Sequence, residues 1–557
     1  MNGLLIIPAA QPVAPDLQFE FGPISPCAIP IEGKPALTYI LAQHHHTAAE
    51  IATTESLTTV IVTSKRVPGD CIPRRTANRC HVLEVAYTKD IGHTVLQALE
   101  TGAADERRLI VNFADTVVKC DTSDLDYVVF SNSSDTSRWT SFTLDDADAI
   151  DEITDKSNAP GTSGKVFCGV FSFSNARLFK HLLRQFVNSN TNEDSFYLAL
   201  REYTRLKKVG WHEADEWFDF GHIDNYYALQ RNISKKARVF NSQDLSPEKG
   251  IIRKRSQRTE DFIHEIQWYL KLPKPISYIS PRVVDYSLDS NNCYLDLDFY
   301  SYLSLQDMWL YSRFDMATWE RIFLSVFEKL ADMSQFSLDE DDHGSIEKSL
   351  LEMYLYKTLE RTGQYTGNPL FEKFSNAEIE INGEIYPGLN ATLARLADDL
   401  QTVGVIRPGK FCIIHGDLCF SNILFDRRTG VSKLIDPRGK FGEFDVYGDS
   451  GYDCAKLCHS VLGNYDFFVQ DQFDLVETEN GYTCTANHQV HHSRIRNLFI
   501  QLFEQKTDHE LLQIRFVESL LFLSMVPLHD DNPRAQLAFA CRGLEIYHNA
   551  LKGNIDI

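Results

Sequence analysis

Two carboxylates and an amide lie close together in residues 411–439, which read FCIIHGDLCFSNILFDRRTGVSKLIDPRG. Asp417 follows an apolar run, Asn422 comes next, and Asp436 ends a second apolar run. NILF and VSKLI are typical of two short strands, and folding them about Thr429 pairs positions whose numbers sum to about 858. Asn422 and Asp436 satisfy that sum, so we expect their side chains at the same end of the hairpin. Such hard oxygen ligands suit Mg²⁺, which often shares its ligands with phosphates.

This group of residues could carry out phosphoryl transfer, which depends mainly on positioning and charge neutralisation. Asp417 would accept the hydrogen bond, and finally the proton, of an acceptor hydroxyl, while Asn422 and Asp436 would hold Mg²⁺. Upstream, Lys254 in GIIRKRS is expected on a strand and Glu265 on the next helix. An ion pair between them would direct the lysine at nucleotide phosphates, and the alternative is an ordinary surface pair.

The elements that must position these residues fall into two regimes. Up to about residue 235, apolar strand-like runs alternate with helical stretches, among them LLIIPAA, LTTVIVTS, RLIVNFAD, LDYVVFS and GKVFCGVFSFS. This alternation predicts an α/β domain over residues 1–235 with a mostly parallel sheet between helices.

The second regime predicts a domain over residues 236–557. Residues 236–302 indicate a small strand-rich lobe with one helix, TEDFIHEIQWYLKL, and residues 303–557 a large helical lobe interrupted only by the hairpin. YLDLDFYSY is expected to connect the lobes. NSQDLSPEKG, between the first two strands, is the only candidate for a phosphate-binding loop.

Composition limits the classes of function. The chain has 557 residues and a formal net charge of −22, which argues against a nucleic-acid-binding face. Its twelve cysteines form no CxxC pair, a pattern that favours reduced thiols in a cytoplasm. The amino terminus has no basic leader, and no segment approaches the roughly 20 apolar residues of a membrane span. We therefore expect a cytoplasmic protein, whose oligomeric state the sequence leaves open.

The segments HGDLCFSNIL, KLIDPRG and YGDSGYDCAKLCHS resemble the aminoglycoside phosphotransferase and choline kinase group. The match passes through Asp417, Asn422, Asp436, Asp449 and Asp453. The resemblance implies a two-lobed, protein-kinase-like α+β fold, ATP as phosphoryl donor, Mg²⁺, and a small hydroxyl compound as acceptor. The sequence departs from the group at DPRG, where many relatives have an aromatic or acidic residue after the metal-binding aspartate.

The first regime resembles the sugar-1-phosphate and phosphocholine nucleotidyltransferases, which have a Rossmann-like fold of the glycosyltransferase-A type. The resemblance rests on LLIIPAA, ISPCAIPIEGKPALTYIL, VNFADTVV, GKVFCGVFSFS and EWFDFGHIDNYYAL. It implies metal binding by Asp115 and Asp219, with CTP or UTP as nucleotidyl donor; structural turn residues are the alternative. Two features depart from the pattern: QPVAPDLQFEFGP replaces the Gly-rich triphosphate loop, and Cys27 replaces a lysine.

Together these observations predict a bifunctional enzyme that phosphorylates a sugar or an amino alcohol and then activates the product with a nucleotide, for surface polysaccharide (capsule) biosynthesis. The alternative is a kinase with a degenerate amino-terminal domain that binds substrate or regulates. A scaffold of two inactive domains is a third hypothesis, which the complete set of Asp417, Asn422 and Asp436 opposes. A cationic acceptor such as choline would need an aromatic cage, for which Trp268, Trp309 and Trp319 are candidates unless they are core residues.

Overall fold

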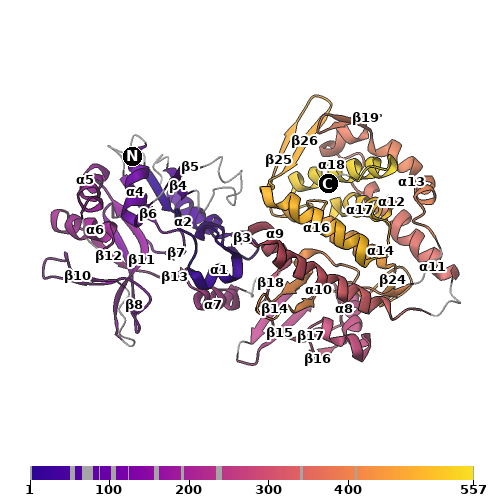
Figure 1. Ribbon diagram of the computed structural model, residues 1–557, viewed down its shortest axis with the longest axis horizontal. Helices are drawn as coiled ribbons and strands as arrows, with labels where there is room; N and C mark the ends of the chain where they lie inside the picture. Colours follow the sequence, from indigo (N-terminus) through magenta and orange to yellow (C-terminus); the bar gives the residue numbers. More distant parts are fainter. Residues whose placement is uncertain are drawn as a thin grey trace. The chain divides into compact units, whose positions relative to one another are not determined.

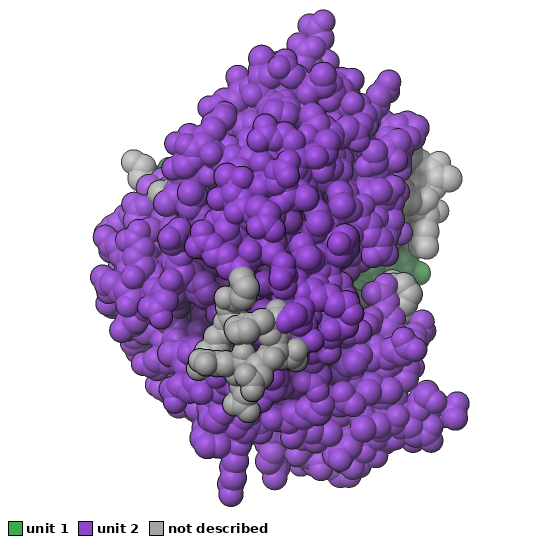
Figure 2. Space-filling model, turned by 90° about the vertical axis from the view of Figure 1, so that its right-hand side faces the viewer, with its two compact units in different colours: residues 1–230, 311–313 green, residues 231–310, 314–557 purple. Residues whose placement is uncertain are grey.

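The computed structural model describes residues 3–50, 57–64, 80–86, 88–101, 108–122, 124–155, 162–189, 193–233, 241–246, 248–338, 343–407 and 411–555. It divides into two compact units, green and purple in Figure 2. Unit 1 consists of residues 1–230 with 311–313, and unit 2 of residues 231–310 with 314–557. The predicted boundary between residues 235 and 236 lies outside the described residues.

Unit 1 is built on a β-sheet that is nine-stranded within the described ranges, in the order β10-β9-β11-β6-β1-β4-β5, with β8 beside β11 and β12 beside β8. The strands are β1 (Gly3–Pro8), β4 (Leu57–Ser64), β5 (His81–Val85), β6 (Arg108–Asn112), β8 (Tyr127–Ser133), β9 (Ser141–Leu144), β10 (Ile150–Thr154), β11 (Gly164–Phe173) and β12 (Gly210–Glu213). Small antiparallel pairs join β2 (Pro30–Ile31) to β3 (Lys34–Pro35) and β7 (Thr116–Lys119) to β13 (Glu216–Asp219).

The expectation of a mostly parallel sheet is correct for only some of its strand pairs, which include β8 with β12. Strand β1 pairs in parallel with β4 and β6, and β4 pairs in parallel with β5. Strand β11 instead pairs antiparallel with β6, β8 and β9. No helix is present between β6 and β11 in the described chain. The strands there are joined without the helical crossover that a parallel connection needs, which accounts for the antiparallel pairing.

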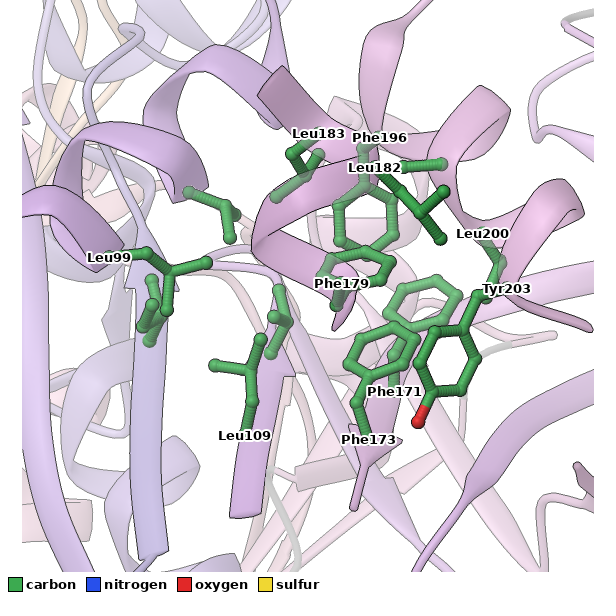
Figure 3. Packing of buried hydrophobic residues seen from close by; sticks show 14 of the residues in the cluster. Leu99, Leu109, Phe171, Phe173, Phe179, Leu182, Leu183, Phe196, Leu200 and Tyr203 are labelled. Carbon is green, nitrogen blue, oxygen red and sulfur yellow. The ribbon is translucent and has the colours of Figure 1, made fainter. Parts of the chain in front are cut away.

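Helices cover the sheet of unit 1 and bury its core. They are α1 (Pro15–Phe21), α2 (Ala36–Glu50), α4 (Ile91–Glu100), α5 (Ala176–Val187), α6 (Ser195–Leu206) and α7 (Ile223–Ile233). Figure 3 shows Phe171 and Phe173 of β11 beside Phe179 of α5 and Tyr203 of α6. The rings of Phe173 and Phe179 stack with centroids 3.8 Å apart. This aromatic packing fixes α5 and α6 on the sheet.

The small lobe of unit 2 has the predicted composition of strands and one helix. Its antiparallel sheet has the order β14-β15-β17-β16, formed by β14 (Asn241–Ser246), β15 (Ile251–Ser256), β16 (Val283–Ser287) and β17 (Tyr294–Asp298). Helix α8 (Thr259–Lys271) follows β15, and the 3₁₀ helix η3 (Lys274–Ile279) follows α8. In Figure 1 these strands lie at one end of the unit and the long carboxy-terminal helices at the other.

Two predictions for this lobe are wrong in detail. NSQDLS is itself strand β14, so the connection to β15 is the short segment 247–250, of which residue 247 is outside the described residues. The candidate loop thus keeps its place between the first two strands but is shorter than the segment named from the sequence. YLDLD is strand β17, so only residues 299–302 remain as the connector before β18 (Leu303–Ser304). Alternating apolar residues at Leu295 and Leu297, both buried, are the strand signal.

The large lobe is mainly helical. Its helices are α9 (Leu305–Tyr311), α10 (Met316–Ser334), α11 (His343–Leu350), the π-helical turn η4 (Leu351–Tyr356), α12 (Lys357–Gly363), η5 (Pro369–Ser375), α13 (Leu389–Val403), η6 (Phe420–Asn422), α14 (Ser450–Val461), α15 (Tyr465–Val469), α16 (Val490–Lys506), α17 (Leu511–Met525), η7 (Val526–His529) and α18 (Pro533–Leu551). The predicted hairpin is β22 (Ile423–Phe425) with β23 (Ser432–Leu434). Strand β21 (Cys412–Ile413) pairs with β24 (Tyr447–Gly448).

The hairpin is not the only interruption of the helices, contrary to the prediction. A second sheet has the order β20-β19-β26-β25, formed by β19 (Glu378–Ile381), β20 (Glu384–Pro387), β25 (Phe473–Glu477) and β26 (Gly481–Ala486). Asn382 and Gly383 join β19 to β20, both with positive φ. An Asn-Gly pair between runs of alternating apolar and polar residues is the strongest short hairpin signal. The sequence EIEINGEIYP therefore already indicated this hairpin.

One helical segment in the described part of the chain, Leu511–His529, is long and apolar enough to cross a membrane, with a mean hydropathy of 1.6. The expectation that no segment approaches this length and composition is therefore wrong. Most of the segment, 78% of its apolar window, is buried inside the structure. It packs against α14 and α18, so its apolar character matches the role of a core helix.

Candidate active site

The β22–β23 hairpin places its polar residues as the sequence predicts. Ile423 pairs with Leu434, and the Ile435 amide donates to the Asn422 carbonyl over 3.0 Å, which extends the ladder to the open end of the hairpin. Asn422 and Asp436 therefore lie at that same end, as predicted. Asp436 has a φ of 58°, a left-handed conformation in which the chain turns sharply after the strand.

Asp417 lies against this hairpin end. The Asn422 side-chain amide donates to the Asp417 carbonyl over 2.9 Å and to its carboxylate over 3.0 Å. On its other oxygen, Asp417 forms an ion pair with Lys456 of α14 at 2.8 Å. Burial would raise the pKa of Asp417, but Lys456, followed by His415 and Arg438, outweighs burial and lowers that pKa. Asp417 is therefore ionised at neutral pH, as an acceptor for a hydroxyl proton must be.

Lys254 of β15 forms the predicted ion pair with Glu265 of α8. Its ammonium group also lies 2.6 Å from Asp436. Burial would lower the pKa of Lys254, and the two carboxylates, Asp436 first, outweigh that effect and raise it. The small lobe thus delivers a fixed positive charge to the hairpin end, where phosphate oxygens would need one.

Backbone contacts hold the two lobes of this site in register. Gly439 has a φ of 67°, and a Cβ there would lie 2.0 Å from the carbonyl of His264 on α8. Only glycine fits such an approach, which explains the glycine of DPRG.

Asp453 accepts the amides of His415 and Gly416, each over 2.7 Å. Asp449 caps the start of α14 through the amide of Gly451. Asp453 therefore supports the segment that carries Asp417, and Asp449 supports the start of α14.

Sequence reasoning missed a set of cations beside Asp417. Lys357 of α12 donates to the Tyr452 hydroxyl over 3.3 Å, and Arg438 donates to the same oxygen over 3.2 Å. Lys456 lies one turn after Tyr452 on α14, on the same face. A lysine in the apolar run YDCAKLC was a detectable signal for Lys456. Lys357 and Arg438 come from distant segments, and their approach to Tyr452 could not be read from the sequence.

The oxygen atoms that this site offers are of the kind that bind the metal ion of a Mg·nucleotide. Asp436 offers a carboxylate that is 43% exposed, and Asn422 an amide oxygen at the same hairpin end. These are hard oxygen donors of the kind that Mg²⁺ shares with phosphates. Within the described ranges there is no cluster of three or more His, Cys, Asp or Glu side chains arranged for a metal, so a divalent ion here would complete its shell with phosphate oxygens and water.

Unit 1 contains a cavity of about 660 Å³ at the carboxyl ends of neighbouring parallel strands β1 and β6. This is where open α/β sheets usually bind ligands. The segment after β1 contributes Ala10 and Gln11, and the segment after β6 contributes Asp115. The lining is rich in carboxylates, namely Asp90, Asp115, Asp155, Glu193 and Asp194, beside Lys89 and His222. Asp90 and Asp194 are already engaged as caps of α4 and α6.

The structure brings Asp115 and Asp219 together. Asp219 on β13 pairs with Thr116 on β7, the neighbour of Asp115. A Cβ on Gly221 would lie 2.6 Å from one Asp115 oxygen and 3.2 Å from one Asp219 oxygen, so both carboxylates border the same point. Asp219 already accepts hydrogen bonds from Trp139, Asn225 and the Gly221 amide. That engagement favours a positioning role for Asp219.

The segment QPVAPDLQFEFGP offers little for a pyrophosphate group. It forms helix α1 rather than an open loop. Three of its residues are prolines, which have no amide hydrogen. The amide of Val13 donates to Ile24, that of Leu17 to Asp16, and that of Gln18 to Ala14. Cys27, in the position expected for lysine, is fully buried. These three amides of the segment are therefore already engaged, and Cys27 supplies no positive charge.

Comparison with known families agrees with the site in unit 2. Residues 251–486 match the model of the phosphotransferase enzyme family. This part of the chain is a kinase-like phosphotransferase domain, and the chain is an enzyme. The matched range contains Lys254, Glu265, Asp417, Asn422 and Asp436. A search of curated proteins gives no match.

Three of the solved structures similar to the chain are each matched over 42% of this chain. HddC from Yersinia pseudotuberculosis, complexed with GMP-PN, is 16% identical, with 99% of its chain covered and a TM-score of 0.31. UDP-glucose pyrophosphorylase complexed with UDP-glucose is 14% identical, with 100% covered and a TM-score of 0.32. CTP:phosphocholine cytidylyltransferase from Streptococcus pneumoniae (LicC) is 12% identical, with 98% covered and a TM-score of 0.31. These likenesses are too weak to assign an activity to unit 1.

Proposed function

We propose that unit 2 is an ATP-dependent, Mg²⁺-dependent kinase that phosphorylates a hydroxyl group of a small molecule. The observation that carries this proposal is the meeting of Asp417, Asn422, Asp436 and Lys254 at one hairpin end. The first three come from the catalytic segment and Lys254 from the small lobe. Structural ion pairs alone would not need an ionised, partly exposed carboxylate at the centre of the group.

In the proposed reaction the acceptor oxygen attacks the γ-phosphorus of ATP. The new O–P bond forms as the bond from that phosphorus to the β–γ bridging oxygen breaks, and ADP leaves. Asp417 orients the hydroxyl and receives its proton. Lys254, held by Glu265, binds nucleotide phosphates. Asn422 and Asp436 would hold Mg²⁺, which neutralises the charge of the phosphates when bound.

The test is ADP release by the purified chain, given ATP and Mg²⁺, against a panel of sugars and amino alcohols, with product mass measured. We expect acceptor-dependent ADP release and a mass gain equal to one phosphoryl group. A chain that binds no Mg·ATP and phosphorylates nothing in the panel would contradict the proposal.

As a second function, unit 1 would transfer a nucleotidyl group from CTP or UTP to the phosphorylated product. The cavity at the ends of β1 and β6, with Asp115 and Asp219 bordering one point, supports it. Two metal ions held there would stabilise the attacking and leaving oxygens. The carboxylate-rich lining and the engaged amides of α1 favour the alternative, a substrate-binding or regulatory module. Pyrophosphate release decides between them.

Together, the two activities would make a nucleotide-activated sugar or amino alcohol, a building block of surface polysaccharides. Such a pathway would operate in the cytoplasm, where ATP and nucleoside triphosphates are available. The described cysteines are all unbridged, in agreement with a reducing compartment.

A further inference from the structure

The acceptor side of the kinase site is defined by Asp417, because this residue receives the acceptor hydroxyl. The nucleotide side lies at Lys254 and Asp436. Lys456 binds the Asp417 oxygen that does not contact Asn422. Cations around Lys456 therefore lie beside the acceptor position.

Three further cations gather there. Lys357 and Arg438 converge on the Tyr452 hydroxyl, and the Lys357 ammonium group also lies over the Tyr452 ring, 5.5 Å from its centroid. Arg361, one turn after Lys357 on α12, donates to the Ser524 carbonyl over 3.3 Å. Each of the three is half-buried. We call Lys357, Arg361, Arg438 and Lys456 the cationic cluster.

Apart from Lys456, this cluster has no carboxylate counter-ion. Considering the described residues, no Asp or Glu lies within salt-bridge distance of Lys357, Arg361 or Arg438, although the chain as a whole carries a formal charge of −22. The carboxylates on α14 have other partners: Asp449 binds the hydroxyl of Tyr354 and Asp453 binds backbone amides. Half-buried positive charges without counter-ions are costly, and an anion bound among them would remove that cost.

The local electrostatics agree with this geometry. Burial, together with Arg438, Arg361 and Lys456, lowers the pKa of Lys357 to about 7, against a smaller opposing effect of Tyr452. Burial is the largest cause of this shift, and the neighbouring cations add to it. Lys357 also directly follows the π-helical turn η4. Such turns are frequent at functional sites.

A cationic acceptor finds the opposite conditions. Trp268, Trp309 and Trp319, the candidates for an aromatic cage, are each fully buried, with 0% exposure. Trp268 donates to the Ile414 carbonyl, and Trp309 packs edge-on against Trp319. They are core residues, so the cage hypothesis is wrong for these three. A quaternary ammonium group would meet the cationic cluster without a cage to offset the repulsion.

We propose that the acceptor carries an anionic group, a carboxylate or a phosphate, which binds Lys357, Arg438 and Arg361 while its hydroxyl faces Asp417. This inference rests on the kinase function proposed for the same site and narrows its acceptor to anionic hydroxyl compounds. Carboxylate and phosphate share the chemistry that the cluster recognises, since arginine and lysine bind both.

The test uses matched acceptors that differ only in charge. Glucose, glucosamine, glucuronate and glucose 6-phosphate form one series; glycerol, ethanolamine, glycerate and glycerol 3-phosphate form another. ADP release by the full chain with Mg·ATP gives kcat/KM for each. We expect anionic members to exceed their neutral and cationic counterparts by roughly 10- to 100-fold, the effect of charged hydrogen bonds. A comparison of the carboxylate members with the phosphate members shows which of the two anions the site prefers. A neutral or cationic member with the highest kcat/KM would overturn the inference.

Variants separate the cluster from the nucleotide side. Lys357→Met and Arg438→Met should raise KM for the anionic acceptor roughly 10- to 100-fold and leave KM for ATP within about twofold. Lys357→Arg, which keeps the charge, should restore most of the loss. Lys506→Met, at an exposed lysine in the last turn of α16, is the matched control and should change neither constant. A rise in KM for ATP with no change for the acceptor would assign the cluster to the nucleotide instead.

A binding measurement covers the case in which no panel member is phosphorylated. Inorganic phosphate is titrated calorimetrically into the chain saturated with Mg·ADP, so that the nucleotide side is occupied. Wild type and Lys506→Met should bind it, and Lys357→Met should bind it more weakly. Equal affinity in all three refutes the anion site. Failure to bind Mg·ADP at all would instead refute the kinase proposal, so the two failures can be told apart.

Discussion

The kinase site of unit 2 and the cavity of unit 1 would both handle phosphates, yet their charges are opposite. Lys254, Lys456 and the rest of the cationic cluster surround the kinase site. The charged side chains that line the cavity of unit 1 are mainly carboxylates, with Lys89 as its lysine. Transferring a phosphoryl or nucleotidyl group requires cations that neutralise charge as it develops. Unit 2 provides cationic side chains in addition to the Mg²⁺ proposed for its site, whereas the cavity of unit 1 would depend mainly on bound metal ions.

This difference in charge supports a catalytic function for the site in unit 2 more strongly than for the cavity in unit 1. In unit 2, the substitution of a single site residue should inactivate phosphoryl transfer. In unit 1, activity should appear only with divalent metal and vanish with either the metal or its carboxylates.

The largest effect is expected for Asp417→Asn. It removes the proton acceptor while keeping the shape of the side chain, so kcat should fall by about 10²- to 10⁴-fold. Mg·ATP affinity should change little, because the residue contacts Asn422 and Lys456 rather than the Lys254 pair. Steady-state kinetics with calorimetric nucleotide titration measures both. Turnover at the wild-type rate would show that another group accepts the proton.

The activity of unit 1 is tested in the full chain, with the kinase of unit 2 inactivated by Asp417→Asn. Given a phosphorylated acceptor, Mg²⁺ and each of CTP, UTP, GTP, ATP and dTTP, it should release pyrophosphate with one of them. Asp115→Ala should lower that rate by about 10²-fold or more, as loss of an electrostatic catalytic group does, and chelation of Mg²⁺ should abolish it. If no triphosphate yields pyrophosphate, unit 1 is a binding module. The scarcity of cationic side chains in its cavity then explains the lack of nucleotidyl transfer.

Asp436→Ala should weaken Mg·ATP binding and activity together. The residue is both the proposed metal carboxylate and a partner of Lys254 at 2.6 Å. Charged contacts of this kind contribute about 1.5–3 kcal/mol, which corresponds to roughly 10- to 100-fold in affinity. Mg²⁺-dependent nucleotide titration is the measurement, with Asp426→Ala in the turn of the same hairpin as control. Unchanged affinity and turnover would remove Asp436 from the site.

The sequence predicted the parts of the site that are local or belong to a shared motif. Asn422 and Asp436 follow from the register of one hairpin, which turn chemistry determines. Lys254 and Glu265 lie on successive elements, and their pairing in the structure agrees with the pattern of the family.

The parts that sequence reasoning missed depend on packing between distant segments. Lys357 and Arg438 meet at Tyr452 through helix packing that no spacing reveals. The second sheet of unit 2 was a different kind of omission, because Asn382-Gly383 marked its first hairpin. The antiparallel pairs of β11 in the unit 1 sheet follow from the absence of helices between β6 and β11 in the described residues. The succession of strand-like runs in the sequence already indicated this.

The smallest predicted effect is a pH dependence of acceptor binding. Tyr452 has a pKa lowered to about 7: burial would raise it, but Lys357, Arg438 and Lys456 outweigh burial. The pKa of Lys357 is itself lowered to about 7. Because the two groups are coupled, the proton lost near neutrality belongs to the pair. Whichever group releases it, the cluster loses one positive charge as pH rises through about 7.

Affinity for an anionic acceptor should therefore be greatest below pH 7 and fall above it, by about three- to tenfold in KM between pH 6 and 8. The other charged groups near the pair bear on the same titration. Arg438 and Lys456 lower the pKa of both groups, Arg361 lowers that of Lys357, and Asp417 raises that of Tyr452. Asp453, whose pKa burial raises to about 7, loses a proton in the same range and adds to the fall. Tyr452→Phe leaves Lys357 and Asp453 to titrate, so it should shift the midpoint without removing the trend. A KM for the anionic acceptor that is flat over this range, with the KM for ATP also flat, would show that the cluster does not contact the acceptor.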